Sequence, residues 1–340
     1  MGGQATVMPQ KPQPTNKQQG RVRFGICADV HKDIMHDADS RLATFIDEMN
    51  RENVDFIIQL GDFCFPAEHN RGFLSIWQQF RGPRYHVLGN HDMQGHHTTD
   101  DAVKFLNLPN RYYSFDMNGY HFVVLDANER RESPPPSNPN FPSYIGHEQL
   151  KWLKHDLLAT DFPTFLFSHQ MLQDDKGLDG REEVQALLRE VNEKAGWQQV
   201  VAALCGDLHV DYHQQISGIH YLVVNSMSNY WIGEDWQHAR YNQLIDSHFP
   251  WLRYTAPYKD PLYATITVES DGTIVVQGRE SEFVGPSPQD LGFNGYPGRK
   301  KWGCIMPKIS SRILKMGNQP QYVADMPQPH HTYTMQSIVK

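Results

Sequence analysis

Short apolar runs and amphipathic stretches alternate along most of the chain. Runs with the length and composition of strands occupy residues 22–28, 54–60, 85–88, 120–125, 164–167 and 199–205. Between them, apolar residues recur at helical spacing, first at positions 42, 45, 46 and 49, where Ser40 is placed to cap the helix. Further helices are expected at 73–80, 147–158 and 184–191. This alternation predicts an α/β layered fold with helices on both faces of the sheet.

The second half of the chain adds more strand patterns. Runs at 212–216 and 220–224 are followed by a hairpin, 262–268 and 273–276, which turns at Asp271-Gly272. A mixed β-sandwich flanked by helices therefore fits the pattern better than a purely parallel sheet.

The two ends of the chain lack this periodicity. Residues 1–20 are polar and rich in Pro and Gln, which predicts a disordered leader. Residues 21–284 carry the pattern of one folded domain. Residues 285–340 are aperiodic and contain many Gly and Pro residues, which predicts an irregular C-terminal extension, packed on the domain or partly disordered.

Charge and hydropathy exclude some classes of function. The chain has 31 Lys+Arg and 39 Asp+Glu, a net charge of −8, whereas a protein that coats nucleic acid needs a basic surface. No apolar run reaches the roughly 18–20 residues that span a bilayer, so no transmembrane segment is expected. We expect a soluble protein, either cytoplasmic or exported after loss of an upstream signal. The oligomeric state is left open.

Three of the four cysteines are expected to be structural. Cys27, Cys64 and Cys205 lie in or beside apolar runs, which favours small buried residues over disulfides or metal ligands. Cys304 lies in the aperiodic extension.

Five polar clusters each follow an apolar strand directly. They are Asp29-Val30-His31, Gly61-Asp62, Gly89-Asn90-His91-Asp92, Ser168-His169 and Gly206-Asp207-Leu208-His209. Taken alone, most of them are ordinary turn chemistry. Together they would deliver Asp, His and Asn side chains to the carboxyl edge of one sheet, where ligand groups tend to lie. Such a cage of oxygen and nitrogen atoms suits divalent or trivalent first-row metals.

The order D-x-H, G-D, G-N-H-[DE], H, G-H-x-H resembles the calcineurin-like metallophosphoesterases over Asp29 to His209. The resemblance implies a β-sandwich flanked by helices, with two divalent or mixed-valence ions of Mn, Fe or Zn at its edge. By position, one metal would take Asp29, His31 and His209, the second would take Asn90, His169 and Asp207, and Asp62 would bridge them. Residues 21–284 would then be the catalytic domain.

The chain departs from the family at one ligand. Asp207 stands where the last motif normally has its first histidine. The change replaces a borderline nitrogen with a hard, negatively charged oxygen, which favours Mn, Mg or Ca over Zn at the second position. It also leaves open weak binding of that metal.

Two branches of the family fit poorly. Leu88 stands where serine/threonine protein phosphatases have an Arg before G-N-H-E. Phe65 stands where purple acid phosphatases have a ligand tyrosine. The remaining pattern is similar to small-molecule phosphodiesterases and phosphatases. It predicts a hydrolase that uses a metal-activated hydroxide on small phosphodiesters or nucleotide-like substrates.

Three alternatives accompany this prediction. The first is a phosphomonoesterase of the same fold. The second is a non-catalytic scaffold, but every ligand position still holds a side chain that can coordinate a metal. The third is a nuclease, which the acidic balance disfavours.

The remaining candidates are residues around the metals. His91, next to Asn90, is placed to protonate the leaving oxygen, and Asp92 would either orient it or cap its own loop. His96 would line the pocket or lie in a solvated loop. Tyr230 and Trp231 would bind a base or sugar by stacking, or belong to the core.

Overall fold

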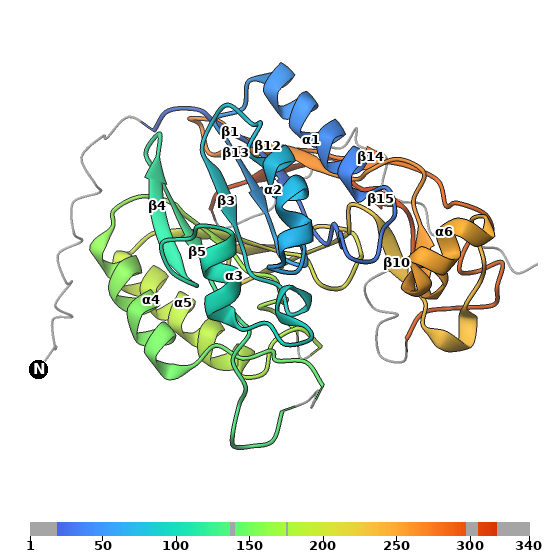
Figure 1. The fold of residues 1–340 in the computed structure, drawn as a ribbon. Coiled ribbons are helices and arrows are strands. Elements are labelled where there is room, and N and C mark those ends of the chain that lie inside the picture. The colour runs from blue at the N-terminus through green and yellow to red at the C-terminus, as the bar shows by residue number, and fades with distance from the viewer. Residues whose placement is uncertain (1–18, 137–139, 175, 297–304, 318–340) are drawn as a thin grey trace, which may run out of the picture.

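Two six-stranded sheets pack face to face in the computed structural model, and helices flank them on both sides (Figure 1). The structure describes residues 19–136, 140–174, 176–296 and 305–317. The predicted β-sandwich between helices is confirmed. None of the helices within these ranges has the length and apolarity that crossing a bilayer requires.

The first sheet has the strand order β16-β13-β12-β1-β2-β3. Its strands are β1 (Val22–Cys27), β2 (Phe56–Gln59), β3 (Arg84–His86), β12 (Ala264–Val268), β13 (Thr273–Gln277) and β16 (Arg312–Lys315). Strands β1, β2 and β3 are parallel, and β12 pairs antiparallel with β1. The three parallel strands therefore end at the same edge.

The second sheet has the order β4-β5-β6-β7-β9-β8. Its strands are β4 (Tyr113–Met117), β5 (Tyr120–Val124), β6 (Thr164–Phe167), β7 (Val200–Cys205), β8 (Tyr212–Ile216) and β9 (Ile219–Val223). The central strands β5, β6, β7 and β9 are parallel, whereas β4 and β8 pair antiparallel at the two edges.

Helices pack on the outer faces of both sheets. They are α1 (Ala38–Glu52), α2 (Arg71–Trp77), α3 (Thr99–Phe105), α4 (His147–Ala159) and α5 (Arg181–Ala195). Apolar residues of α1 and α2 form one core cluster with the first sheet, and those of α4 and α5 join the larger cluster that fills the sandwich. Figure 1 shows these two pairs of helices on opposite sides of the molecule.

Small elements complete the fold. They are η1 (Glu68–Asn70), η2 (His91–Met93), β10 (Asn229–Trp231), η3 (Glu234–Trp236), α6 (Gln243–His248), η4 (Pro250–Tyr254), β11 (Thr255–Pro257), β14 (Arg279–Glu280) and β15 (Lys308–Ile309). Strands β10 and β11 pair as a two-stranded ribbon that carries α6 at one end of the molecule (Figure 1).

Both faces of β1 and β2 are largely buried, which explains why most of their residues are apolar. Phe24 stacks on Phe56 with ring centroids 4.7 Å apart, and both rings meet Phe122 of the second sheet edge-on. Gly25 faces α1 instead, and a Cβ there would lie 2.2 Å from the Met49 sulfur. A glycine at this position lets α1 approach the sheet closely.

Several local predictions are wrong or incomplete. Helix α1 begins at Ala38 with Asp37 at its N-cap, so Ser40 lies inside the helix. Residues 312–315, expected to be irregular, form strand β16 and pair with β13. Its four residues are too few to show a strand pattern, and its stability comes from backbone pairing with β13. The boundaries at 20 and 284 stay a prediction, and residues 1–18 lie outside the described residues.

The three cysteines inside the described ranges match their prediction. Cys27, Cys64 and Cys205 are buried and free. Burial raises the pKa of the Cys205 thiol to about 12, so it stays protonated at neutral pH. Cys304 lies outside the described residues.

A buried histidine ties α4 to the edge of the second sheet. Nδ1 of His121 lies 2.6 Å from Asp116 Oδ1, and Nε2 lies 2.9 Å from Asp156 Oδ2. Burial disfavours the charged imidazole, but hydrogen bonds and charges of Asp156 and Asp116 outweigh it and raise the pKa of His121. Stability from this group is therefore complete below its unfolded pKa of about 6.5 and is lost as pH rises through the folded pKa.

We predict that His121→Gln destabilises the fold most at acidic pH. The loss should be about 1–3 kcal/mol at pH 6, the range for hydrogen bonds to charged groups, and should shrink by pH 9. Urea unfolding at both pH values measures it. The exposed His155→Gln on α4 is the control, with an expected change of no more than about 0.5 kcal/mol. An equal loss from His121→Gln at both pH values would contradict a charged His121.

Candidate metal centre

The polar clusters meet where parallel strands of the two sheets end. The loops after β1 and β2 carry Asp29, His31 and Asp62, and the loops after β6 and β7 carry His169, Asp207 and His209. These strands come from both sheets, so the site lies at one edge of the sandwich. The predicted convergence of these side chains is observed.

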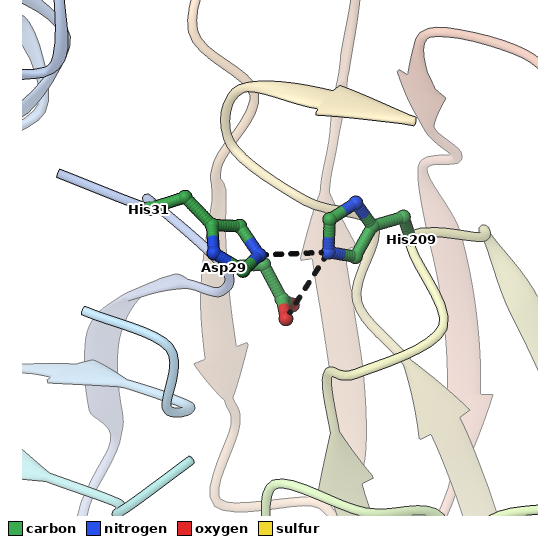
Figure 2. Close-up of side chains that lie close together, drawn as sticks. All are labelled: Asp29, His31 and His209. Atoms are coloured by element: carbon green, nitrogen blue, oxygen red, sulfur yellow. Dashed lines mark hydrogen bonds and ion pairs between the residues drawn. The ribbon is translucent and has the colours of Figure 1, made fainter. Parts of the chain in front are cut away.

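The first group of candidate ligands is Asp29, His31 and His209. One ligand atom from each lies within 4.8 Å of the other two, and all three residues are buried. His209 Nε2 lies 3.1 Å from His31 Nε2 and 3.4 Å from Asp29 Oδ1. Figure 2 shows the two rings directed toward each other beside the carboxylate.

The hydrogen bond on the far side of His209 defines its tautomer. Nδ1 lies 2.7 Å from the carbonyl oxygen of Asn229, and a carbonyl can only accept. In the neutral ring Nε2 therefore carries no proton, and its lone pair faces the His31 nitrogen and the Asp29 carboxylate. These atoms repel one another unless a cation or a proton lies between them. A backbone carbonyl that orients a histidine in this way is typical of metal ligands.

The second group is Asp29, Asp62 and His169, again with ligand atoms within 4.8 Å of one another. His169 Nδ1 donates to the carbonyl oxygen of Leu60 at 2.7 Å. Its Nε2 lies 3.3 Å from Asp62 Oδ2 and 3.7 Å from Asp207 Oδ1. The donor set and its orientation therefore fit a metal at this group as well.

Opposing charges dominate the electrostatics. Burial disfavours the charged form of His169, but the carboxylates of Asp62, Asp29 and Asp207 outweigh it and raise its pKa well above the usual value. Burial would raise the pKa of Asp62, but His169 and the other histidines hold it far below the usual range. Burial lowers the pKa of His31 well below its usual value, and neighbouring histidines lower it further, against Asp62. The buried carboxylates thus favour a positive charge at their centre.

The backbone of the site is held in an uncommon conformation. Nine non-glycine residues of the described chain have positive φ, and five of them are candidate ligands: Asp29, His31, Asp62, Asp207 and His209. The left-handed region is costly for most residues, although Asp and His are among those that tolerate it. Strain of this kind collects at functional sites, where the surrounding structure enforces it.

Two motif glycines are required by close packing of the ligand loops. A Cβ on Gly89 would lie 2.2 Å from both the backbone nitrogen and Oδ1 of Asp62. A Cβ on Gly206 would lie 2.7 Å from Asp29 Oδ2. The glycine in each motif therefore makes room for a ligand from the loop after another strand.

Asn90 and Asp92 lie in the loop after β3. Asn90 is buried at the N-terminus of η2. Asp92 accepts hydrogen bonds from the backbone N–H groups of Phe63, Cys64 and Gly89. Burial and the charge of Asp62 raise the pKa of Asp92 to about 8. Asp92 thus ties its own loop to the loop after β2, and its predicted role in orienting His91 stays a prediction.

His91 lies between the metal groups and a cavity. Its backbone N–H donates to Asp62 Oδ1 at 2.8 Å, and its ring lies 5.4 Å from that of His31 and 5.3 Å from that of Phe141. Its Nδ1 is buried and has no hydrogen-bond partner among the described residues. The imidazole of His91 also lines the cavity, next to His31 and Asp62.

The cavity beside His91 has a volume of about 370 Å³. It is lined by His31, Asp33, Ile34, Asp62, Phe63, Cys64, Phe65, His91, Asp92, Gln94, Phe141, Trp231 and Trp251. We call it the aromatic cavity, because Phe65, Phe141, Trp231 and Trp251 form much of its wall.

Two predicted substrate contacts do not line the aromatic cavity. Successive side chains of β10 point to opposite faces, so Trp231 lines the cavity while Tyr230 is buried and packs near Phe293. His96 is exposed and is not among the lining residues. Sequence reasoning missed Phe141 and Trp251, because neither belongs to a motif or a periodic segment.

Comparison with known proteins agrees with this geometry. The sequence model of the calcineurin-like phosphoesterase family matches residues 22–211, more than half of the chain. No curated protein sequence matches the chain at a significant level.

Three solved structures resemble this chain to different degrees. A dimetal phosphatase from Danio rerio has a TM-score of 0.55 at 18% identity, covering 77% of this chain and 98% of that chain. GAP50, the anchor in the inner membrane complex of Plasmodium, has a TM-score of 0.49 at 14% identity, with coverages of 89% and 90%. Purple acid phosphatase PPD1 from yellow lupin (Lupinus luteus) has a TM-score of 0.46 at 17% identity, with coverages of 84% and 54%.

At 18% identity the likeness to the dimetal phosphatase supports the fold alone, whereas the match to the family model supports membership. The matched segment contains all the strand-end clusters, and their side chains meet at one edge of the sandwich. The chain therefore belongs to the calcineurin-like phosphoesterase family, as a metal-dependent phosphoric ester hydrolase.

Proposed function

We propose that this hydrolase acts on small phosphodiesters, nucleotide-like esters included, with two metal ions at the edge of the sandwich. The position of one oxygen atom carries the two-metal proposal. Asp62 Oδ2 lies 3.7 Å from His31 Nε2 and 3.3 Å from His169 Nε2. A single carboxylate oxygen between one histidine of each group is suited to bridge two metals.

The proposed ligand sets follow from this bridge. Asp29, His31 and His209 would hold one metal, Asn90, His169 and Asp207 the other, and Asp62 both. Asp29 contributes to both buried groups, so its two oxygens offer further contacts. The oxygen of Asp207 favours Mn²⁺ over Zn²⁺ at the second position.

The residues around the metals complete the chemistry. When bound, two metals supply a hydroxide nucleophile near neutral pH and neutralise charge on the phosphoryl oxygens. His91, which lines the cavity beside both ligand groups, is placed to donate a proton to the departing oxygen. Asp92 keeps His91 and Asp62 in place, because it bonds the backbone of both loops.

Charge around the cavity supports a diester over a monoester. None of the lining residues found in the described chain is Lys or Arg, and Leu88 is buried where protein phosphatases have an Arg. A monoester dianion gains most from a guanidinium clamp, whereas a diester carries one negative charge. The phosphomonoesterase is the alternative function.

The substrate proposal predicts a preference for bis(4-nitrophenyl) phosphate over 4-nitrophenyl phosphate. We expect kcat/KM with Mn²⁺ to favour the diester, and removal of metal by chelation to abolish both activities. A preference of about tenfold for the monoester, roughly 1.4 kcal/mol of transition-state stabilisation, would select the alternative. Full activity of the metal-free protein would contradict the two-metal site.

Asp207→His should move metal preference toward Zn²⁺. The substitution restores an imidazole at the second position, and we expect the ratio of Zn²⁺- to Mn²⁺-supported kcat/KM to rise by about tenfold, or 1.4 kcal/mol. Titration of both proteins with each metal measures the ratio. Asp47→His, on the exposed face of α1, is the control and should leave it unchanged. An unaltered ratio in Asp207→His would place this residue outside the metal's ligands.

His91→Gln should slow hydrolysis most when the leaving group is a poor one. General acid help is typically worth ~10²–10⁴-fold, and nitrophenolate needs little of it. We therefore expect a large loss of kcat with an alkyl leaving group and a small loss with bis(4-nitrophenyl) phosphate. The exposed His155→Gln serves as control. An equal loss with both substrates would indicate a positioning role for His91.

A further inference from the structure

We infer that the aromatic cavity binds an uncharged, apolar, ring-sized group on the leaving side of the phosphoester. The inference rests on the proposed function and extends it to the organic part of the substrate. It follows from the place of the cavity, the chemistry of its wall and its charge.

The cavity opens directly from the metal edge. His31, Asp62 and His91 belong to both, and the ring of Phe141 lies 5.3 Å from the ring of His91 on the cavity side. A leaving oxygen beside His91 would therefore have space for its organic group next to Phe141. The site that would bind the phosphoryl group thus adjoins the apolar wall of the cavity.

Two tryptophans from elements that follow the last ligand motif form part of the wall. Trp231 ends β10 and Trp251 lies in η4, and both rings pack near Tyr254, with centroids 6.1 and 5.6 Å away. Trp251 is nevertheless 56% exposed. Its open face is apolar surface that a bound ring would cover, and aromatic pairs add to such burial.

The charge of the cavity argues for an uncharged occupant. Among the described residues its lining has no Lys or Arg to receive a second phosphate or a carboxylate. Outside the metal edge its main charge is Asp33, whose oxygens accept from Phe65 N at 2.7 Å and Asn70 Nδ2 at 2.8 Å. The negative charge of Asp33 repels anions. Because these protein donors already occupy its oxygens, the carboxylate has little capacity left to pair with a cationic ligand.

The size of the cavity sets the scale of the group. A volume of about 370 Å³ lies at the small end of the roughly 300–1,000 Å³ typical of small-molecule sites. An apolar cavity of about 150 Å³ already holds a benzene molecule. The aromatic cavity therefore has room for a single ring or a short branched chain together with its linking atoms.

Non-hydrolysable phosphonates test the inference on the metal-loaded full chain. Inhibition constants are measured for methylphosphonate, phenylphosphonate, 4-carboxyphenylphosphonate and 4-(aminomethyl)phenylphosphonate. Phenylphosphonate should bind at least about tenfold more tightly than methylphosphonate, since the ring leaves water for an apolar wall. Either charged substituent should remove most of that gain.

Variants assign the gain to the cavity. Trp251→Ala and Phe141→Ala should each reduce the phenyl-to-methyl ratio to about threefold or less while leaving methylphosphonate binding unchanged. Trp251→Phe should retain most of the ratio, because a ring remains in the wall. The control is Leu244→Ala on α6, which is 69% exposed and is not a lining residue.

The outcomes separate this inference from the proposed function. If both phosphonates inhibit equally in the wild type, or the ratio survives Trp251→Ala and Phe141→Ala, the cavity does not bind the organic group and the two-metal proposal stands. If a charged ring binds most tightly, the uncharged assignment is wrong. If neither phosphonate inhibits and no diester or monoester is hydrolysed, the proposed function fails and this inference fails with it.

Discussion

Crowded lone pairs at one edge of the sandwich are the constraint around which the site is organised. The ring nitrogens of His31 and His209 face each other at 3.1 Å, and the carboxylates of Asp29 and Asp62 lie beside them. Hydrogen bonds from the outer ring nitrogens to backbone carbonyls keep His169 and His209 from turning away. Only a positive charge at the centre makes this arrangement favourable. The ligand atoms repel one another in its absence, and bound metal ions would relieve that repulsion.

The two sheets supply the stability that this edge lacks. Left-handed backbone at five candidate ligands and buried carboxylates both oppose folding. The stacked phenylalanines between the sheets and the apolar faces of the flanking helices bury enough surface to offset these costs. Because β1 and β2 come from one sheet and β6 and β7 from the other, the ligand loops gain rigidity from the whole sandwich.

Strand β10 links the metal edge to the aromatic cavity. The backbone carbonyl of Asn229 orients His209, and the side chain of Trp231, two residues further on, lines the cavity. A three-residue strand thus couples one candidate ligand to the wall that we assign to the organic group of the substrate. Its middle residue, Tyr230, points the other way into the core.

The order and types of residues along the chain specify which ligand atoms are present and that they follow strands, and therefore the chemistry. Polar residues directly after apolar strands indicate a metal edge without coordinates, because parallel strands end on the same side and the residue types name the ligand atoms. Strand Thr164–Phe167 has the bounds that the sequence predicts, since its apolar run is a local pattern.

The pairing of β16, the contacts of Asp92 and the wall of the cavity depend on long-range packing, so they follow only from the tertiary structure. Strand β16 is a strand only because β13 offers it a partner, and Asp92 caps loops because Phe63 and Cys64 lie against it. Trp251 and Phe141 come from segments with no motif, and nothing in their neighbours along the chain marks them as one wall. Local spacing specifies which atoms can bind a metal, whereas the shape of a cavity depends on contacts between residues far apart in the sequence.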